Sequence, residues 1–356
     1  MTLYLPKLKN LLDKKEEDWG NPEENQMSMV LYGIPALDKA LYGINIVSGE
    51  LILIRGQQKR RKTTLFLNIL ANIYSAPIPL EKPTSVIDVL ESGMTPERYR
   101  DSLLSIVASK ILMEQGHTPN TCGVCEGFCR ELKLSPDYLR FHNRTKAQAE
   151  AIEQADAKMS EWPIFIFGAH EEEGNTRDLD EALLGSIKAS SKAWHVQYGQ
   201  HYDLAPIKEL RELSRWEFLR QYTGAKIFAV DHIQQYDFDR DYSDYEKQQR
   251  VISKTSAFVA QKHTVMFAIS QVSLTSVRDA RQGSGRAYEA GGTKASAEAN
   301  VIMSPQYSFD DRGVMYIVLE ESRRAPSFTV ECGIEAVSGA FYGDQRIEYK
   351  RKFISD

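Results

Sequence analysis

The sequence predicts an α/β fold with a central, mostly parallel sheet flanked by helices. Short apolar runs of strand length alternate along the chain with segments of helical pattern, and parallel strands need such crossovers. Several of these runs end on a polar or charged residue, where α/β sheets carry their ligands. The predicted strands span residues 51–55, 84–91, 162–169, 225–235 and 264–271, and runs at 300–303, 314–319 and 328–332 complete an antiparallel edge.

Composition limits the classes of protein to which the chain can belong. A chain of 356 residues, 42% of them hydrophobic, fits one large α/β domain or two small ones with a packed core. Because the formal net charge is -5, any contact with nucleic acid must come from local patches. No apolar run is long enough to span a bilayer, and no signal peptide opens the chain. Four cysteines are too few for a disulfide scaffold, so we expect a cytoplasmic protein without membrane partners.

The chain is predicted to have three parts. Residues 1–29 form an N-terminal arm with one amphipathic helix, on the spacing of Leu5, Leu8, Leu11 and Leu12, and a polar linker. Residues 30–345 form the main domain, with a helical insert at about 92–160, and residues 346–356 form a basic tail. A lone amphipathic helix cannot bury its apolar stripe unaided, so the arm packs on its own domain or on a neighbouring subunit.

Residues 51–65 have the layout of a phosphate-binding P-loop: an apolar strand, a loop that starts at Gly56 and a helix that starts near Thr63. The loop N–H groups and the helix N-terminus both direct partial positive charge at an anion. Lys62 would reach the terminal phosphates, and the Thr63 hydroxyl would ligate Mg²⁺. The predicted nucleotide contacts of this loop are Gly56, Gln57, Gln58, Lys59, Arg60, Arg61, Lys62, Thr63 and Thr64.

The loop departs from the usual pattern G-x-x-x-x-G-K-[ST] at one position, because Arg61 stands where the second glycine belongs. Glycine is used there because it relaxes φ and lets a phosphate approach closely. Arg61 therefore either adds a charge to the phosphate cradle or weakens hydrolysis. A basic loop before an ordinary helix is the alternative to a phosphate site, and the later motifs decide between them.

Three later strands end in polar residues that we expect at the same edge of the sheet as the P-loop. Glu91 is placed to polarise an attacking water. Asp231 closes an apolar run in the manner of a Walker B element, whose carboxylate holds the Mg²⁺ shell. Gln271 can sense the terminal phosphate and relay its state to the loop that follows. Together with the P-loop, these three residues indicate a nucleotide site more specifically than any one of them does alone.

That following loop, residues 276–298, is rich in glycine, arginine and small residues. Its predicted DNA contacts are Arg278, Arg281, Arg286 and Lys294. Basic side chains on such a loop can follow the phosphate backbone of a single strand. An ordinary solvated loop is the alternative interpretation.

The helical insert contains Cys122, Cys125 and Cys129, near His117 and His142. Thiolates and imidazole suit tetrahedral Zn²⁺, which takes four ligands. The spacing C-x₂-C-x₃-C supplies only part of such a site, and the fourth ligand cannot be fixed from the sequence. We favour the other interpretation, in which three reduced thiols pack on the insert.

With these motifs, the chain from about residue 30 to 345 resembles the RecA-like ATPases, and specifically the DnaB-type hexameric helicases. Arg323 matches the family's arginine finger, although Glu321 replaces the lysine of its Lys-x-Arg pair. A short arm in place of the family's N-terminal helical domain looks like a phage or mobile-element version. The other segments that carry the resemblance are residues 33–38, 89–91, 230–234, 269–271 and 290–302.

The resemblance implies a RecA-like core that works as an NTP-dependent motor on single-stranded DNA, with ATP or another NTP and Mg²⁺ as cofactors. It implies a hexameric ring with nucleotide at the subunit interfaces, other replication proteins as partners, and Lys62, Glu91, Gln271 and Arg323 as catalytic residues. Two alternatives remain. One is a recombinase or mediator that forms filaments on DNA. The other is a nucleotide-binding scaffold that has lost hydrolysis, for which Arg61 and Glu321 argue.

Overall fold

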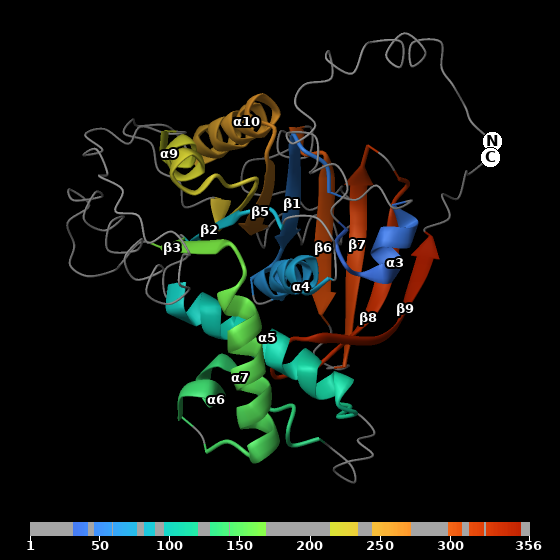
Figure 1. The fold of residues 1–356 in the computed structure, drawn as a ribbon. Coiled ribbons are helices and arrows are strands. Elements are labelled where there is room, and N and C mark those ends of the chain that lie inside the picture. The colour runs from blue at the N-terminus through green and yellow to red at the C-terminus, as the bar shows by residue number, and fades with distance from the viewer. Residues whose placement is uncertain are drawn as a thin grey trace, which may run out of the picture.

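The computed structural model describes twelve stretches of the chain, and all structural statements below concern them. They are residues 31–41, 46–58, 60–76, 82–89, 96–119, 129–141, 143–168, 214–233, 244–271, 298–307, 313–323 and 325–349. Within them the strands form one sheet in the order β3-β2-β4-β5-β1-β6-β7-β8-β9 (Figure 1).

In this order, the neighbouring strands from β3 across to β6 pair in parallel. The pairs β6–β7, β7–β8 and β8–β9 are antiparallel. This confirms the predicted α/β class with a mostly parallel sheet and an antiparallel edge. The strands are β1 (Glu50–Gly56), β2 (Ser85–Val89), β3 (Ile164–Gly168), β4 (Ile227–Asp231), β5 (Val265–Gln271), β6 (Val301–Tyr307), β7 (Val314–Ser322), β8 (Phe328–Ile334) and β9 (Phe341–Tyr349). The sequence pattern did not predict β9, which extends the antiparallel edge.

Helices cover both faces of the parallel part of the sheet. On one face α4 contacts β1, β5 and β6, and on the other α10 contacts β1 and β5. The described helices are α3 (Pro35–Ala40), α4 (Lys62–Ser75), α5 (Pro96–Glu114), α6 (Pro136–Phe141), α7 (Lys146–Ser160), α9 (Ser214–Thr223) and α10 (Asp244–Lys262). None of the described helices is long and apolar enough to cross a membrane.

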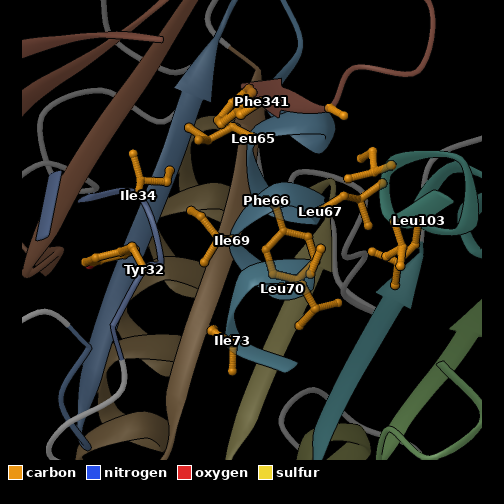
Figure 2. Packing of buried hydrophobic residues seen from close by; sticks show 14 of the residues in the cluster. Tyr32, Ile34, Leu65, Phe66, Leu67, Ile69, Leu70, Ile73, Leu103 and Phe341 are labelled. Atoms are coloured by element: carbon orange, nitrogen blue, oxygen red, sulfur yellow. The ribbon is translucent and has the colours of Figure 1, made fainter. Parts of the chain in front are cut away.

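The central strand β1 shows why both faces are covered. Side chains alternate across a strand, so Ile52 and Ile54 belong to the core on the α4 side, whereas Leu51 and Leu53 belong to the core under α9 and α10. Figure 2 shows the α4 side, where Leu65, Phe66, Ile69 and other apolar residues of that helix pack into the core. The core on this side holds α4 against the sheet.

The segment between β2 and β3 contains the helices α5, α6 and α7 in its described part. Helices α5, α6 and α7 pack on one another and lie together at the bottom of Figure 1. A reciprocal cap at the start of α7 supports this arrangement, since the Thr145 hydroxyl accepts from the Gln148 N–H and the Gln148 side chain accepts from the Thr145 N–H. Helix α5 also packs on α4 and so connects the insert to the P-loop helix.

The strand ends meet at one edge of the sheet. Gly56 at the end of β1 pairs in register with Gln271 at the end of β5. Asp231 at the end of β4 stands opposite Ile269 of β5 and Val89 of β2. The carboxyl ends of β1, β2, β4 and β5 therefore lie side by side, which is where ligands bind in open α/β sheets.

Candidate nucleotide-binding site

The P-loop joins the end of β1 to the start of α4. Helix α4 begins at Lys62, and the carbonyl of Arg61 accepts the first hydrogen bond of the helix from the Leu65 N–H. The Lys62 side chain is buried, and its Nζ donates to the Gln57 carbonyl at 2.9 Å. The ammonium group thus folds back over the loop that would surround a phosphate. A lysine in this position can neutralise phosphate charge at short range.

Arg61 has φ 62° and ψ 29°, a left-handed conformation that residues with a Cβ rarely adopt. The backbone therefore takes at this position the conformation for which glycine is suited. The Arg61 guanidinium donates to the Ala336 carbonyl at 2.6 Å, in the turn between β8 and β9. Its charge lies against that turn.

Asp231 is fully buried at the end of β4. Its Oδ2 accepts from the Thr63 hydroxyl at 2.7 Å and from the Tyr99 hydroxyl at 3.2 Å. Its Oδ1 is buried without a hydrogen bond from the described residues. His232 Nε2 lies 3.2 Å from this oxygen.

The arrangement of Thr63 and Asp231 fits a bound Mg²⁺ ion. Both side chains offer oxygen atoms, which are the ligands that Mg²⁺ prefers, and one buried carboxylate oxygen still lacks a hydrogen bond from the described residues. Lys62 starts the same helix, whose N-terminus directs partial positive charge at an anion. These residues can hold a metal–phosphate pair at the edge of the sheet.

Tyr99 is a site residue that sequence reasoning missed. It is fully buried on the first turn of α5 and reaches Asp231, 132 residues further along the chain. The sequence offered one weak signal, a tyrosine in the helix that follows Glu91. That signal could not be interpreted without knowing that α5 packs on α4.

Two other predicted residues lie at opposite edges of the sheet. Gln271 stands beside Gly56 and is half-buried. Arg323 follows β7, which runs antiparallel to β6, so it lies at the other edge, where its N–H donates to the Asn300 carbonyl at 3.3 Å; its side chain is exposed. Buried Arg55, which precedes Gly56, forms an ion pair with Glu320 and so links β1 to β7.

Several predicted residues lie outside the described part of the chain. They are Lys59, Glu91, Cys122, Cys125, His142, Arg278, Arg281, Arg286 and Lys294, and the predicted arm at residues 1–29 lies outside it too. The structure therefore brings together the P-loop, Asp231 and Gln271, and it gives no position for the predicted base or the predicted DNA loop.

Of the three insert cysteines, Cys129 is described. It is buried, and its Sγ lies 3.5 Å from Nδ1 of buried His117. The described residues contain no group of three or more histidine, cysteine or acidic side chains that could hold a metal ion. They place one thiol and one imidazole together.

The strand order, with α4 directly after β1, gives a RecA-like fold close to that of the DnaB helicases. A DnaB-like replicative helicase, studied together with its interactions with primase, is similar with a TM-score of 0.58 and 15% identity, over 96% of this chain and 67% of that one. A second solved structure, that of an ATPase domain, is similar with a TM-score of 0.60 and 14% identity, over 96% of this chain and 100% of that domain. No protein-family model matches the sequence, and no curated protein matches it significantly.

Proposed function

We propose that this chain is an NTP-dependent DNA motor, specifically a DnaB-type replicative helicase that moves on single-stranded DNA. The observation that carries the proposal is the 2.7 Å contact between Thr63 and Asp231, next to a loop over which the Lys62 ammonium group folds. Such a pair serves to hold Mg²⁺ beside the phosphates of ATP or another NTP. The fold shared with a DnaB-like helicase and with a separate ATPase domain supports this class of motor.

The residues of the site would divide the work of hydrolysis. Lys62 neutralises the charge of the terminal phosphates, while Thr63 and Asp231 hold the Mg²⁺ shell. Bound Mg²⁺ supplies further neutralisation of phosphate charge. Glu91 polarises the attacking water, and Gln271 relays the state of the terminal phosphate to the basic loop at residues 276–298.

The proposed assembly is a hexameric ring with nucleotide between subunits. Exposed Arg323 is then available to reach the nucleotide of a neighbouring subunit, as an arginine finger does. Within each subunit the motor domain spans residues 30–345, flanked by the arm at 1–29 and the tail at 346–356. The ring would act in the cytoplasm together with other replication proteins.

The proposed contact with DNA is the basic loop. Replacing Arg278, Arg281 and Arg286 with alanine removes three charges that can pair with phosphates, so affinity for single-stranded DNA should fall and its salt dependence should flatten. If the triple variant binds DNA like the wild type at several salt concentrations, the loop is not the DNA contact.

A strand-separation assay on a forked duplex tests the proposed function. We expect unwinding that requires hydrolysable NTP, and rings in electron micrographs of the assembled protein. Filaments on DNA without unwinding would favour the recombinase alternative. Binding of nucleotide without turnover would favour the scaffold alternative.

We also propose that the insert holds one zinc ion, with His117 and Cys129 as two of its ligands. Zinc bonds of about 2.3 Å to sulfur and about 2.0–2.1 Å to nitrogen, at a tetrahedral angle, put the two donor atoms about 3.5 Å apart. The observed Sγ to Nδ1 distance is 3.5 Å, and without a metal the two groups share a hydrogen bond. Cys122 and Cys125 precede Cys129 in the chain and are the thiols that the sequence offers to complete the site.

A further inference from the structure

A left-handed residue with a Cβ at the start of α4 needs something to hold it in place. Arg61 occupies this position with φ 62°, and its carbonyl accepts the first hydrogen bond of the helix. If Arg61 moved to its preferred backbone region, Lys62 and Thr63 would change direction, because they follow it immediately. The structure shows which element opposes this movement.

That element is the turn between β8 and β9, residues 335–340, which we call the β8–β9 turn. Its Ala336 carbonyl accepts from the Arg61 guanidinium at 2.6 Å, across 275 residues of sequence. The turn also packs tightly on the first turn of α4, since a Cβ added at Gly339 would lie 2.6 Å from Thr64 Cγ2 and 3.4 Å from Arg61 Nη1. Gly339 itself has φ 80°, so a side chain is disfavoured there twice over.

Asn68 adds a second link between the turn and α4. Its Nδ2 donates to the Gly339 carbonyl at 2.9 Å, and its Oδ1 accepts from the Phe341 N–H at 3.0 Å. Asn68 is fully buried, so both bonds are shielded from water. Phe341 belongs to the same core cluster as Leu65 of α4, which Figure 2 shows from close by. The turn is therefore attached at two points, to Arg61 just before α4 and to Asn68 within that helix.

The turn has its own internal support. The carboxylate of buried Glu335 accepts from the N–H groups of Val337 at 2.9 Å and Ser338 at 2.5 Å, and from the Ser338 hydroxyl at 2.8 Å. The Gly339 N–H donates to the Glu335 carbonyl at 2.9 Å. These bonds hold the turn, and with it the Ala336 carbonyl, in position independently of Arg61.

We propose that the β8–β9 turn compensates for the absent P-loop glycine by holding residue 61 in the left-handed conformation, and that Arg61 is a positioning residue. The Ala336 carbonyl holds the guanidinium, the guanidinium holds Arg61 in its left-handed conformation, and that conformation aims Lys62 and Thr63 at the phosphate. Arg61 acts through the backbone that follows it and donates no charge to the phosphate. The inference rests on the proposed nucleotide site and adds a residue and an element to it.

Two substitutions at one position separate this role from a phosphate contact. Arg61→Gly loses the anchor but adopts positive φ readily, whereas Arg61→Ala loses the anchor and keeps the Cβ. We expect the Kd for a fluorescent ATP analogue to stay within about threefold of wild type in Arg61→Gly and to rise about tenfold in Arg61→Ala. The Tm should fall in the same order. Arg98→Ala, which removes an exposed arginine from an ion pair on α5, is the matched control.

A turn variant tests whether the β8–β9 turn acts through Arg61. Glu335→Ala removes the internal support and should weaken nucleotide binding in the wild-type background, but add nothing in the Arg61→Gly background. Equal effects in both backgrounds would overturn the proposal. Equal losses of nucleotide affinity in Arg61→Gly and Arg61→Ala would also overturn it, because the guanidinium would then contact the phosphate itself. Wild-type affinity in both variants would overturn it as well.

These outcomes can be separated from a failure of the proposed function. A wild-type protein that binds no nucleotide would overturn the proposed function alone. The order of the Tm values for wild type, Arg61→Gly and Arg61→Ala would still test the turn, since it needs no ligand. A Tm for Arg61→Gly as low as that for Arg61→Ala would contradict the proposal in that case.

Discussion

Thr63 Oγ1 lies 2.7 Å from Asp231 Oδ2, although 168 residues separate them in the chain. The contact joins the first turn of the P-loop helix to the end of β4. It depends on the parallel sheet, because β1 and β4 are both neighbours of β5 and end at the same edge.

Lys62→Ala should weaken binding of ATP or another NTP by about 10- to 100-fold, because a charge-assisted contact to phosphate is lost. Titration with a fluorescent nucleotide measures this loss. Lys158→Ala removes an exposed lysine on α7 and serves as the control. Unchanged affinity and unchanged hydrolysis in Lys62→Ala would remove the lysine from the site.

Tyr99→Phe should raise the Mg²⁺ concentration needed for half-maximal nucleotide binding by about tenfold, as loss of a group that orients a metal ligand does. The variant keeps the buried ring and removes only the hydroxyl that donates to Asp231. Tyr138→Phe removes a hydroxyl that donates to the Asn143 carbonyl in the insert, and should leave the Mg²⁺ dependence unchanged. The Tyr99 variant should have no further effect when Asp231 is asparagine. An effect of the same size in that background would show that Tyr99 acts only on folding.

The purified protein should carry about one zinc ion per chain, measured by elemental analysis. Cys129→Ser should lose most of that zinc, because serine is a poor zinc ligand. Cys332→Ala changes another buried cysteine, on β8, and should retain the metal. A wild-type protein that is folded and free of metal would leave the thiols as packing residues, which is the interpretation that the sequence favoured.

The stability of the fold should depend on pH through Asp38. Burial raises the pKa of its carboxyl from 3.8 to about 6, although backbone N–H groups of Tyr32, Gly33 and Ile34 act in the opposite direction. The folded state therefore binds this proton more tightly than the unfolded state, so the stabilisation is present below about pH 4 and is lost as the pH rises to about 6. Asp38→Asn should gain free energy of unfolding relative to wild type between about pH 4.5 and 7 in urea titrations. A difference between the two proteins that does not vary with pH would contradict this assignment.

The sheet and the edge of the site could be predicted from the sequence because their signals are local. Each parallel strand is a short apolar run, and Asp231 and Gln271 lie at the ends of such runs. The β9 strand escaped prediction because its residues, FYGDQRIEY, combine a glycine with charged positions and show little apolar character.

The contacts that complete the site could not be predicted, because they depend on how distant elements pack. Tyr99 reaches Asp231 only because α5 packs on α4. The sequence shows that Arg61 occupies the position of the P-loop glycine, but its partner Ala336 lies in a turn 275 residues away. No periodicity or motif reports a hydrogen bond to a backbone carbonyl at that separation.

Phosphate release, measured with and without single-stranded DNA, tests the proposed motor function most directly. We expect turnover that single-stranded DNA stimulates and that Asp231→Asn abolishes. Glu91→Gln should still bind nucleotide but release phosphate at least ~10²-fold more slowly, because it keeps the shape of the side chain and loses the base. Absence of phosphate release from a wild-type protein that binds nucleotide and DNA, or release that survives in Asp231→Asn, would contradict the proposed motor function.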